Sequence, residues 1–248
     1  MCGIAGFCLN KDEHINARKV SMALLNQIVS RGEDATGAAW VQSNKETKKA
    51  TIAVSKAPVA ARNFDPYLGS MPKTTRRAIL HTRWATKGTP ENNLNNHPIV
   101  SGRVVGVHNG VLRNDDAIFR HVRSANRRGQ VDSEAAFALL DRSAVSGYAP
   151  IEVLESVEGR AALAWFDARD KRDLHLARVM ESPLAIGQTV HGSLVFASTM
   201  PLLLKGCDIA GLDMKWLENV DEMTYLKIRR GEILELESIG QSVKEIAS

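Results

Sequence analysis

The first residues of the chain constrain its fold more than any other segment. Residues Cys2 to Leu9 (CGIAGFCL) are apolar on both faces of an extended chain, and the polar run Asn10-Lys11-Asp12 ends them. A short run without polar residues on either face is typical of a strand covered on both sides. We therefore expect the chain to begin in its own interior, as a strand of a layered core.

The spacing of apolar and turn-forming residues predicts the other elements. Helices are expected at Ile15 to Val29, Asp115 to Ala125 and Ser133 to Ala144. Strands are expected at Thr36 to Gln42, Ala50 to Lys56, Ala78 to Thr82, Val104 to His108, Ala161 to Asp167, Leu174 to Arg178, Leu184 to Ile186 and Leu194 to Ser198. The first two of these strands are expected to form a hairpin. Many strands with few helices predict an α+β fold of stacked sheets flanked by helices, in one domain that covers residues 1–248.

Composition excludes several classes of protein. The chain has 248 residues, of which 44% are hydrophobic and 24% charged, so we expect a folded domain rather than a disordered one. The net charge of +4 is spread along the chain, which favours a solvated basic face over a nucleic-acid surface. The longest uncharged run, Ser182 to Leu204, is interrupted by glycines and prolines. It predicts two strands joined by a turn rather than a membrane span.

The cysteines and the amino terminus predict the compartment. Cys2, Cys8 and Cys207 lack the paired spacing of a zinc site and cannot all be bridged, so free thiols in a reducing compartment are expected. The amino terminus has no basic segment followed by an apolar one, and no signal peptide is expected. Together these features predict a cytoplasmic protein.

Cys2 is the first candidate for chemistry. If an aminopeptidase removes Met1, the mature chain begins with a thiol and a free α-amine on one residue. The amine has an ordinary pKa of roughly 8 and the thiol roughly 8.5, so the amine can accept the thiol proton near neutral pH. Alternatively, Cys2 is a small buried apolar residue at a strand end.

Arg83 lies where a strand enters the long polar loop that ends at Pro98. A guanidinium there is a candidate to grip a ligand carboxylate through two hydrogen bonds, and a surface salt bridge is the alternative. Trp84, the next residue, is expected to pack rather than to contact a ligand.

Asn109-Gly110 and Asp132 are further candidates with ordinary alternatives. A side-chain amide beside the open backbone N–H of a glycine is a plausible oxyanion hole, but Asn-Gly is also a common turn pair. Asp132 precedes an apolar helical run, where capping is its default role. Its carboxylate is alternatively a partner for the α-ammonium of an amino acid, which together with Arg83 would clamp both charges.

No metal or cofactor is expected. His81, His97 and His108 fit no common zinc spacing, and no carboxylate cluster accompanies them. His97, before Pro98, is expected to be a structural histidine with satisfied hydrogen bonds that lines the loop. No dinucleotide fingerprint or phosphate loop is present.

Six segments, in order along the chain, resemble the glutaminase domain of class II glutamine amidotransferases, most closely that of the glucosamine-fructose-6-phosphate aminotransferase type. They are Cys2-Gly3-Ile4-Ala5-Gly6, Arg31 to Gly37 (RGEDATG), His81 to Gly88 (HTRWATKG), Asn96-His97-Pro98, Val107 to Gly110 (VHNG) and Val131 to Glu134 (VDSE). A later match, Ser182 to Gly187 followed by Phe196-Ala197-Ser198, extends the resemblance over nearly the whole chain.

The resemblance implies a fold, a substrate and a set of roles. The fold is the four-layer αββα sandwich of N-terminal nucleophile hydrolases, and the substrate is L-glutamine, hydrolysed through a thioester on Cys2. The implied catalytic residues are Cys2, Asn109 and Gly110, the last two as the oxyanion hole. The implied substrate-binding residues are Arg83, Trp84, Thr86, Asp132, Arg31 and His97.

The chain also departs from the family. Lys87 stands where these relatives usually carry histidine, and Ala35 where they usually carry serine. No acceptor or synthase domain is recognisable, so ammonia is expected to pass to an acceptor on a separate protein; the oligomeric state stays open. Two alternatives remain: an N-terminal cysteine hydrolase of another amide, and a non-catalytic glutamine-binding regulatory subunit.

Overall fold

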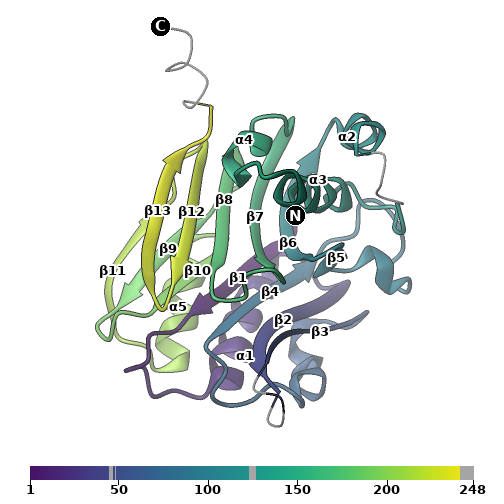
Figure 1. Cartoon of the computed structure of the whole chain (residues 1–248). Helices are drawn as coiled ribbons and strands as arrows, with labels where there is room; N and C mark the ends of the chain where they lie inside the picture. The colour runs from purple at the N-terminus through teal and green to yellow at the C-terminus, as the bar shows by residue number, and fades with distance from the viewer. Residues whose placement is uncertain (45–46, 48, 123–126, 241–248) are drawn as a thin grey trace, which may run out of the picture.

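The computed structural model describes residues 1–44, 47, 49–122 and 127–240, and they form two stacked sheets with helices on the outer face of each (Figure 1). All strand pairs are antiparallel. The four-layer αββα arrangement expected from the sequence is confirmed.

The first sheet has seven strands in the order β11-β9-β10-β1-β4-β2-β3. Strand β1 lies in its middle, paired with β10 on one side and β4 on the other. The strand bounds are β1 Gly3–Cys8, β2 Ala35–Ser43, β3 Ala50–Ala57, β4 Arg77–Arg83, β9 Ala185–Thr189, β10 Leu194–Ala197 and β11 Met214–Asn219. The chain therefore begins at a central strand, as predicted.

The second sheet has six strands in the order β13-β12-β8-β7-β6-β5. Their bounds are β5 Ile99–Ser101, β6 Val104–Leu112, β7 Gly159–Asp167, β8 Leu174–Met180, β12 Thr224–Arg229 and β13 Glu232–Ser238. The strand that carries Asn109, β6, lies beside β7 near one side of this sheet.

Helices cover the two outer faces. Helices α1 and α5 pack on the first sheet, and α2, α3 and α4 on the second. Their bounds are α1 Ala17–Ile28, α2 Asp115–His121, α3 Ser133–Ser146, α4 Pro150–Leu154 and α5 Met200–Ala210, with short 3-10 turns η1 Val29–Arg31, η2 Ala61–Asn63, η3 Asp65–Leu68 and η4 Asn93–Asn95. No helix of the described residues combines the length and apolarity needed to cross a membrane.

Alternation along β1 divides its side chains between two cores. Ala5 and Phe7 pack toward α1 and α5, whereas Ile4 and Cys8 pack against the second sheet. Successive side chains of a strand point to opposite faces, so a strand with an apolar residue at every position fits only between two covered layers. This explains why an uninterrupted apolar run became the central strand.

Several predicted elements need correction. The run Ser182 to Leu204 contains the two expected strands, but α5 begins within it at Met200. Pro201 near the start of α5 is compatible with a helix because a first-turn residue needs no N–H partner. Residues 123–126, at the end of the expected helix from Asp115, lie outside the described residues; the described helix ends at His121.

Candidate active site

Strand periodicity brings Cys2, Arg83 and Asn109 into the space between the two sheets. Each lies an even number of positions from a residue of the core between the sheets, namely Ile4, Ile79 and Val107 respectively. Gly3 pairs with Thr82 across β1 and β4, which places Cys2 next to Arg83 at the same end of the two strands.

Cys2 lies at the start of β1 and is only partly buried. Its Sγ lies 3.7 Å from the carbonyl oxygen of Trp84, and its own carbonyl accepts a hydrogen bond from Arg31 Nε at 2.9 Å. Burial raises the pKa of the thiol; the charge of Arg83 lowers it and that of Asp132 raises it. The pairing of Gly3 with Thr82 places the implied clamp residue Arg83 near the implied nucleophile.

Asn109 is buried, with 1% of its surface exposed, yet its Nδ2 has no hydrogen-bond partner among the described residues. Leaving a buried amide donor unpaired costs about 1–3 kcal/mol, so such a group calls for an explanation. One explanation is that this amide donates to an oxyanion that forms only during the reaction. The next residue, Gly110, has φ 152°, and a Cβ there would lie 1.9 Å from the carbonyl oxygen of Arg160. Only glycine fits this position.

The guanidinium of Arg83 is buried and bound to the loop that follows it. Nη1 donates to Asn96 Oδ1 at 2.9 Å, and Nη2 donates to the carbonyls of Lys87 at 2.5 Å and Gly88 at 2.8 Å. These contacts hold the polar loop against the strand end. The surface salt bridge considered for Arg83 is absent from the described residues, where no carboxylate pairs with it.

Asp132 performs the capping role that its position predicted. One carboxylate oxygen accepts from Ser133 N at 2.9 Å at the start of α3, and the other accepts from Leu112 N at 2.6 Å at the end of β6. The two bonds tie α3 to the strand that carries Asn109. Asp132 is only partly buried.

The loop after Arg83 is open to solvent where the implied substrate contacts lie. Trp84 has 56% of its surface exposed, so less than half of it packs against the rest of the protein. Thr86 is exposed as well. The start of the loop is held by Asp34, whose carboxylate accepts from Ala85 N at 2.7 Å. Lys87, at the position of the family's histidine, places its Nζ 3.9 Å from Asp115.

His97 lies inside the protein at the end of the loop. Its ring stacks on His81 with centroids 4.1 Å apart, and the bond to Pro98 is cis. Neither ring nitrogen has a partner within the described ranges, so the expectation of satisfied hydrogen bonds is wrong. Burial lowers the pKa of His97, which keeps the ring neutral. The ring of His97 is therefore an uncharged, buried packing surface at the end of the loop.

The sequence did not indicate three residues that hold Arg83 and its loop in place. Asn96 binds Arg83, Asp34 holds the loop start, and Lys56 donates to the carbonyls of Asn96 at 2.7 Å and Pro98 at 3.0 Å. Asn96 and Asp34 belong to segments that carry the family resemblance. No local signal gives their roles, because each contact joins residues 13 to 51 positions apart.

Solved structures share this fold. A glutamine phosphoribosylpyrophosphate amidotransferase from B. subtilis, complexed with ADP and GMP, superposes with a TM-score of 0.75 at 19% identity, over 97% of this chain and 50% of that one. A structure described as the allosteric regulatory enzyme of purine biosynthesis superposes with a TM-score of 0.74 at 19% identity, over 97% and 49%. These likenesses show that the chain and both solved structures share one fold.

Residues 81–205 match the family described as the glutamine amidotransferase domain. The chain belongs to this family, in its class II. The matched range contains Arg83, Asn109, Gly110 and Asp132.

Curated relatives are glutamine-fructose-6-phosphate aminotransferases (isomerizing). The protein of Gluconobacter oxydans is 30% identical over 193 residues, and that of Caulobacter vibrioides 31% identical over 194 residues. The matches cover 75% and 76% of this chain, but the chain spans only 30% of the length of either relative.

Proposed function

We propose that this protein hydrolyses the side-chain amide of L-glutamine to glutamate and ammonia, with Cys2 as the nucleophile. The observation that carries the proposal is the buried Asn109 amide, whose Nδ2 has no partner among the described residues and which faces the same space between the sheets as Cys2. The family to which the chain belongs supports the same reaction.

The reaction begins after Met1 is removed. Met1 is 62% exposed, which supports access by an aminopeptidase. The α-amine of Cys2 takes the thiol proton, and the thiolate attacks the amide carbon, forming a C–S bond while the carbonyl electrons move to oxygen. The Asn109 amide and the Gly110 N–H stabilise this oxyanion.

The tetrahedral intermediate then breaks its C–N bond. The protonated α-amine donates its proton to the departing nitrogen, which leaves as ammonia, and a γ-glutamyl thioester remains on Cys2. Water, deprotonated by the same amine, attacks the thioester and releases glutamate. The thiol recovers its proton, so atoms and charge balance over the cycle.

The substrate is held by its two charged groups. Arg83 binds the α-carboxylate, and Asp132 binds the α-ammonium; Arg83 lies beside Cys2 at the same end of β1 and β4. Arg83 now donates to the loop carbonyls of Lys87 and Gly88. Glutamine binding exchanges these bonds for a carboxylate, and the loop with Trp84 and Thr86 closes over the substrate. A zwitterionic clamp favours a free amino acid over another amide.

The ammonia passes to an acceptor on a separate protein. The curated relatives that match this chain are aminotransferases, which supports the transfer of ammonia to an acceptor. Arg31 and His97 form the shell around the nucleophile and the loop, and the 248 residues act as one glutaminase domain. The three free thiols fit a reducing compartment, and we place the reaction in the cytoplasm.

Intact-mass analysis before and after treatment with a glutamine-analogue diazoketone tests the proposal. We expect Met1 to be absent, and one adduct to form on Cys2 and none on the buried thiols of Cys8 and Cys207, which serve as internal controls. Excess glutamine should protect Cys2. A retained Met1, or an unmodified Cys2 in a processed chain, contradicts the mechanism.

A further inference from the structure

A cluster of positively charged side chains lies at the opposite end of β1, around Cys8. Cys8 lies six positions after Cys2 along an extended strand, which is roughly 20 Å at the rise of a β-strand. There the ends of β1 and β4 from the first sheet meet the β7–β8 and β12–β13 turns of the second. They enclose a cavity of about 430 Å³.

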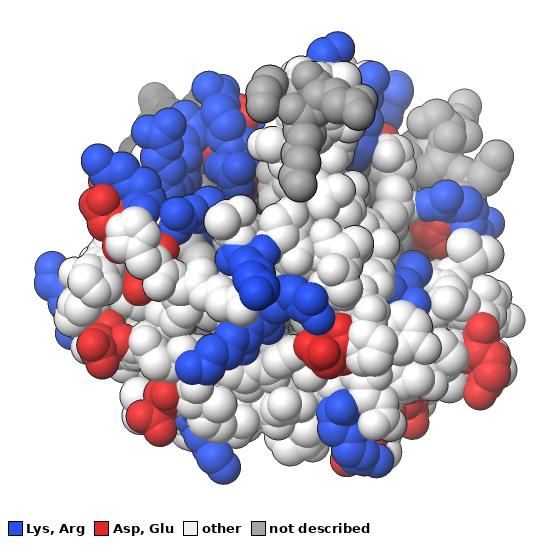
Figure 2. Space-filling model, turned by 90° about the horizontal axis from the view of Figure 1, so that it is seen from below, with Lys and Arg blue, Asp and Glu red and all other residues white. Residues whose placement is uncertain are grey.

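The cavity is lined almost entirely by cations. Besides Cys8 and Leu9, its lining residues are Lys11, Arg76, Arg77, Arg172, Arg229 and Arg230. Figure 2, which shows the molecule from below, has Lys and Arg side chains crowded near the middle of that face. A whole-chain net charge of only +4 makes six cations around one cavity a strong local concentration.

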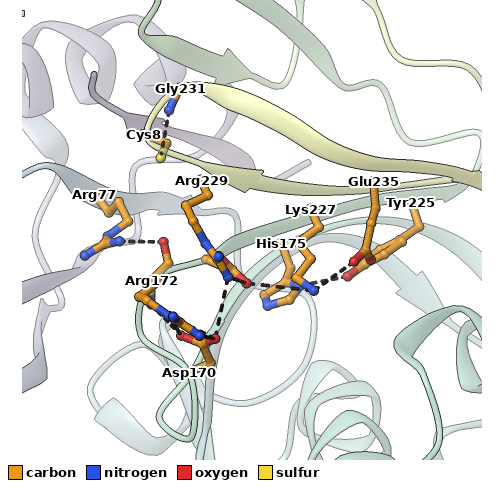
Figure 3. A network of polar contacts seen from close by, with 11 residues as sticks. Cys8, Arg77, Asp170, Arg172, His175, Tyr225, Lys227, Arg229, Gly231 and Glu235 are labelled. Carbon is orange, nitrogen blue, oxygen red and sulfur yellow. Dashed lines mark hydrogen bonds and ion pairs between the residues drawn. The ribbon is translucent and has the colours of Figure 1, made fainter. Parts of the chain in front are cut away.

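Two carboxylates neutralise only part of this charge. Arg172 pairs with Asp170 at 2.6 Å, and Arg229 pairs with Asp173 at 2.5 Å and also approaches Asp170 at 3.6 Å. Figure 3 shows Arg77, Arg172 and Arg229 reaching the same neighbourhood from three separate segments. The two ion pairs fix the positions of Arg172 and Arg229 without removing the excess of positive charge.

The other four cations have no carboxylate partner among the described residues. Arg76 donates to the backbone carbonyls of Asn10 and Glu13, and Arg77 Nη1 to that of Arg172. The Nε of Arg77 is buried and has no partner in the described chain. A guanidinium N–H without a partner, in a residue that lines a cationic cavity, can donate to an anionic acceptor.

The backbone at Arg230 is an independent observation. Arg230 and Gly231 form the two-residue turn between β12 and β13, with φ of 54° and 86°. Such turns favour asparagine or glycine at the first position, and a long side chain there carries backbone strain. The strained position nevertheless holds an arginine at the cavity wall. Strain of this kind is found where a side chain has a function.

The residues that line the cavity favour one kind of anion. Several guanidinium groups that converge from different segments suit a compact anion with three or more acceptor oxygens. The cavity volume lies in the range of small-molecule sites. None of the described residues lining it is aromatic, so it offers no stacking surface for nucleobases. Burial raises the pKa of the Cys8 thiol, which therefore adds no negative charge.

We propose that this cavity is a binding site for a small phosphomonoester, whose phosphate is held by Arg77, Arg230 and Lys11. The site is separate from the glutaminase proposed above and does not depend on it. Lys11 and Arg230 make no ion pair in the described part of the chain, so their charges are available to a ligand.

The test is a titration followed by NMR of backbone amides, with glycerol 3-phosphate as the probe and glycerol as the phosphate-free comparison. We expect saturable shifts at Cys8 and Gly231 with the phosphate ester only. The double variant Lys11→Gln/Arg230→Gly should weaken binding at least about fivefold, because it removes two charge-assisted contacts. Glycine relieves the strain at position 230, so the fold is retained.

The matched control is Arg120→Gln/Lys205→Gln, which removes the same charge from exposed positions on α2 and α5. We expect it to bind like the parent protein. Equal weakening in both double variants, or shifts that do not saturate, would overturn the proposal. A glutamate-rich peptide or a single-stranded DNA hexamer that saturates the same amides at lower concentration than the ester would also overturn it. Because the readout is binding, its failure leaves the glutaminase proposal untouched.

Discussion

The two ends of the β1–β4 pair carry the same two residue types but differ in chemistry. Cys2 and Arg83 lie at one end, and Cys8 and Arg77, which are direct register partners, lie at the other. Burial raises the pKa of both thiols. A thiol beside an arginine is therefore not enough to define a nucleophile.

The two ends differ because the second sheet contributes different residues to each. Into the space between the sheets that Cys2 also faces, it contributes Asn109, an amide donor without a partner among the described residues. Opposite Cys8 it contributes Arg172 and Arg229, and Gly231 N lies 3.4 Å from the Cys8 sulfur. Cys8 is fully buried within the chain, whereas Cys2 is partly exposed at its start. In our two proposals, the first end stabilises a transient oxyanion and the second end binds a stable anion.

The largest expected effect separates the two cysteines. Cys2→Ala should lower glutamine hydrolysis on the order of 10³-fold or more, because no other group forms the thioester. Cys8→Ala should leave the rate within about twofold while costing about 1 kcal/mol of stability for the lost buried atom. Ammonia release and denaturant unfolding measure the two effects. If Cys2→Ala kept the parental rate, or Cys8→Ala lost it, the contrast between the ends would be wrong.

Asn109→Ala should lower kcat by about 10²–10³-fold, the usual cost of one oxyanion-hole donor. Its melting temperature should hold, because no hydrogen bond of Nδ2 is lost within the described residues. Asn10→Ala, at the Cys8 end, is the control and should leave kcat unchanged. A loss of stability without a loss of kcat would assign Asn109 a structural role.

Arg83→Lys should raise KM for glutamine about tenfold or more, because an ammonium cannot reproduce the two-pronged contact with a carboxylate. Arg77→Lys, at the other end of β4, should leave KM unchanged. Steady-state kinetics of both variants measure KM for glutamine. Equal KM values for Arg83→Lys and the parent would remove Arg83 from the substrate clamp.

The smallest effect concerns acid stability. Burial lowers the pKa of His81 at the Cys2 end to about 3, and that of His175 in the second sheet to about 4. Below the ordinary histidine pKa of roughly 6.5, the unfolded chain therefore binds more protons than the folded chain. The free energy of unfolding falls as the pH drops from this value toward the pKa of each folded histidine.

Each of these histidines contributes a slope of up to about 1.4 kcal/mol per pH unit. His81→Gln and His175→Gln should each flatten the fall of unfolding free energy between pH 6.5 and 4. Below pH 4 the effect of His81→Gln should persist longer than that of His175→Gln. Denaturant unfolding at a series of pH values measures the slopes. Unchanged slopes in both variants would show that neither ring stays neutral in the folded protein.

Local pattern in the sequence predicted much of the core and the composition of the site. The apolar run of Cys2 to Leu9 predicted a covered strand, and the β2–β3 hairpin followed from two β-rich segments. Local spacing assigned no element after Ser198, where the structure has α5 and β11 to β13. Strand β13 is largely exposed, so burial constrains its composition little, and its signal is weak.

The sequence by itself determined which faces are buried and which residue types are available, because alternation and helical spacing are local properties of the chain. Only the tertiary structure decided that Asn109 and Cys2 face the same space between the sheets, that Asn96 holds Arg83, and that cations from several segments line one cavity. The reason is physical: which strand ends meet across two sheets depends on the packing of the whole core, and no short segment carries that information.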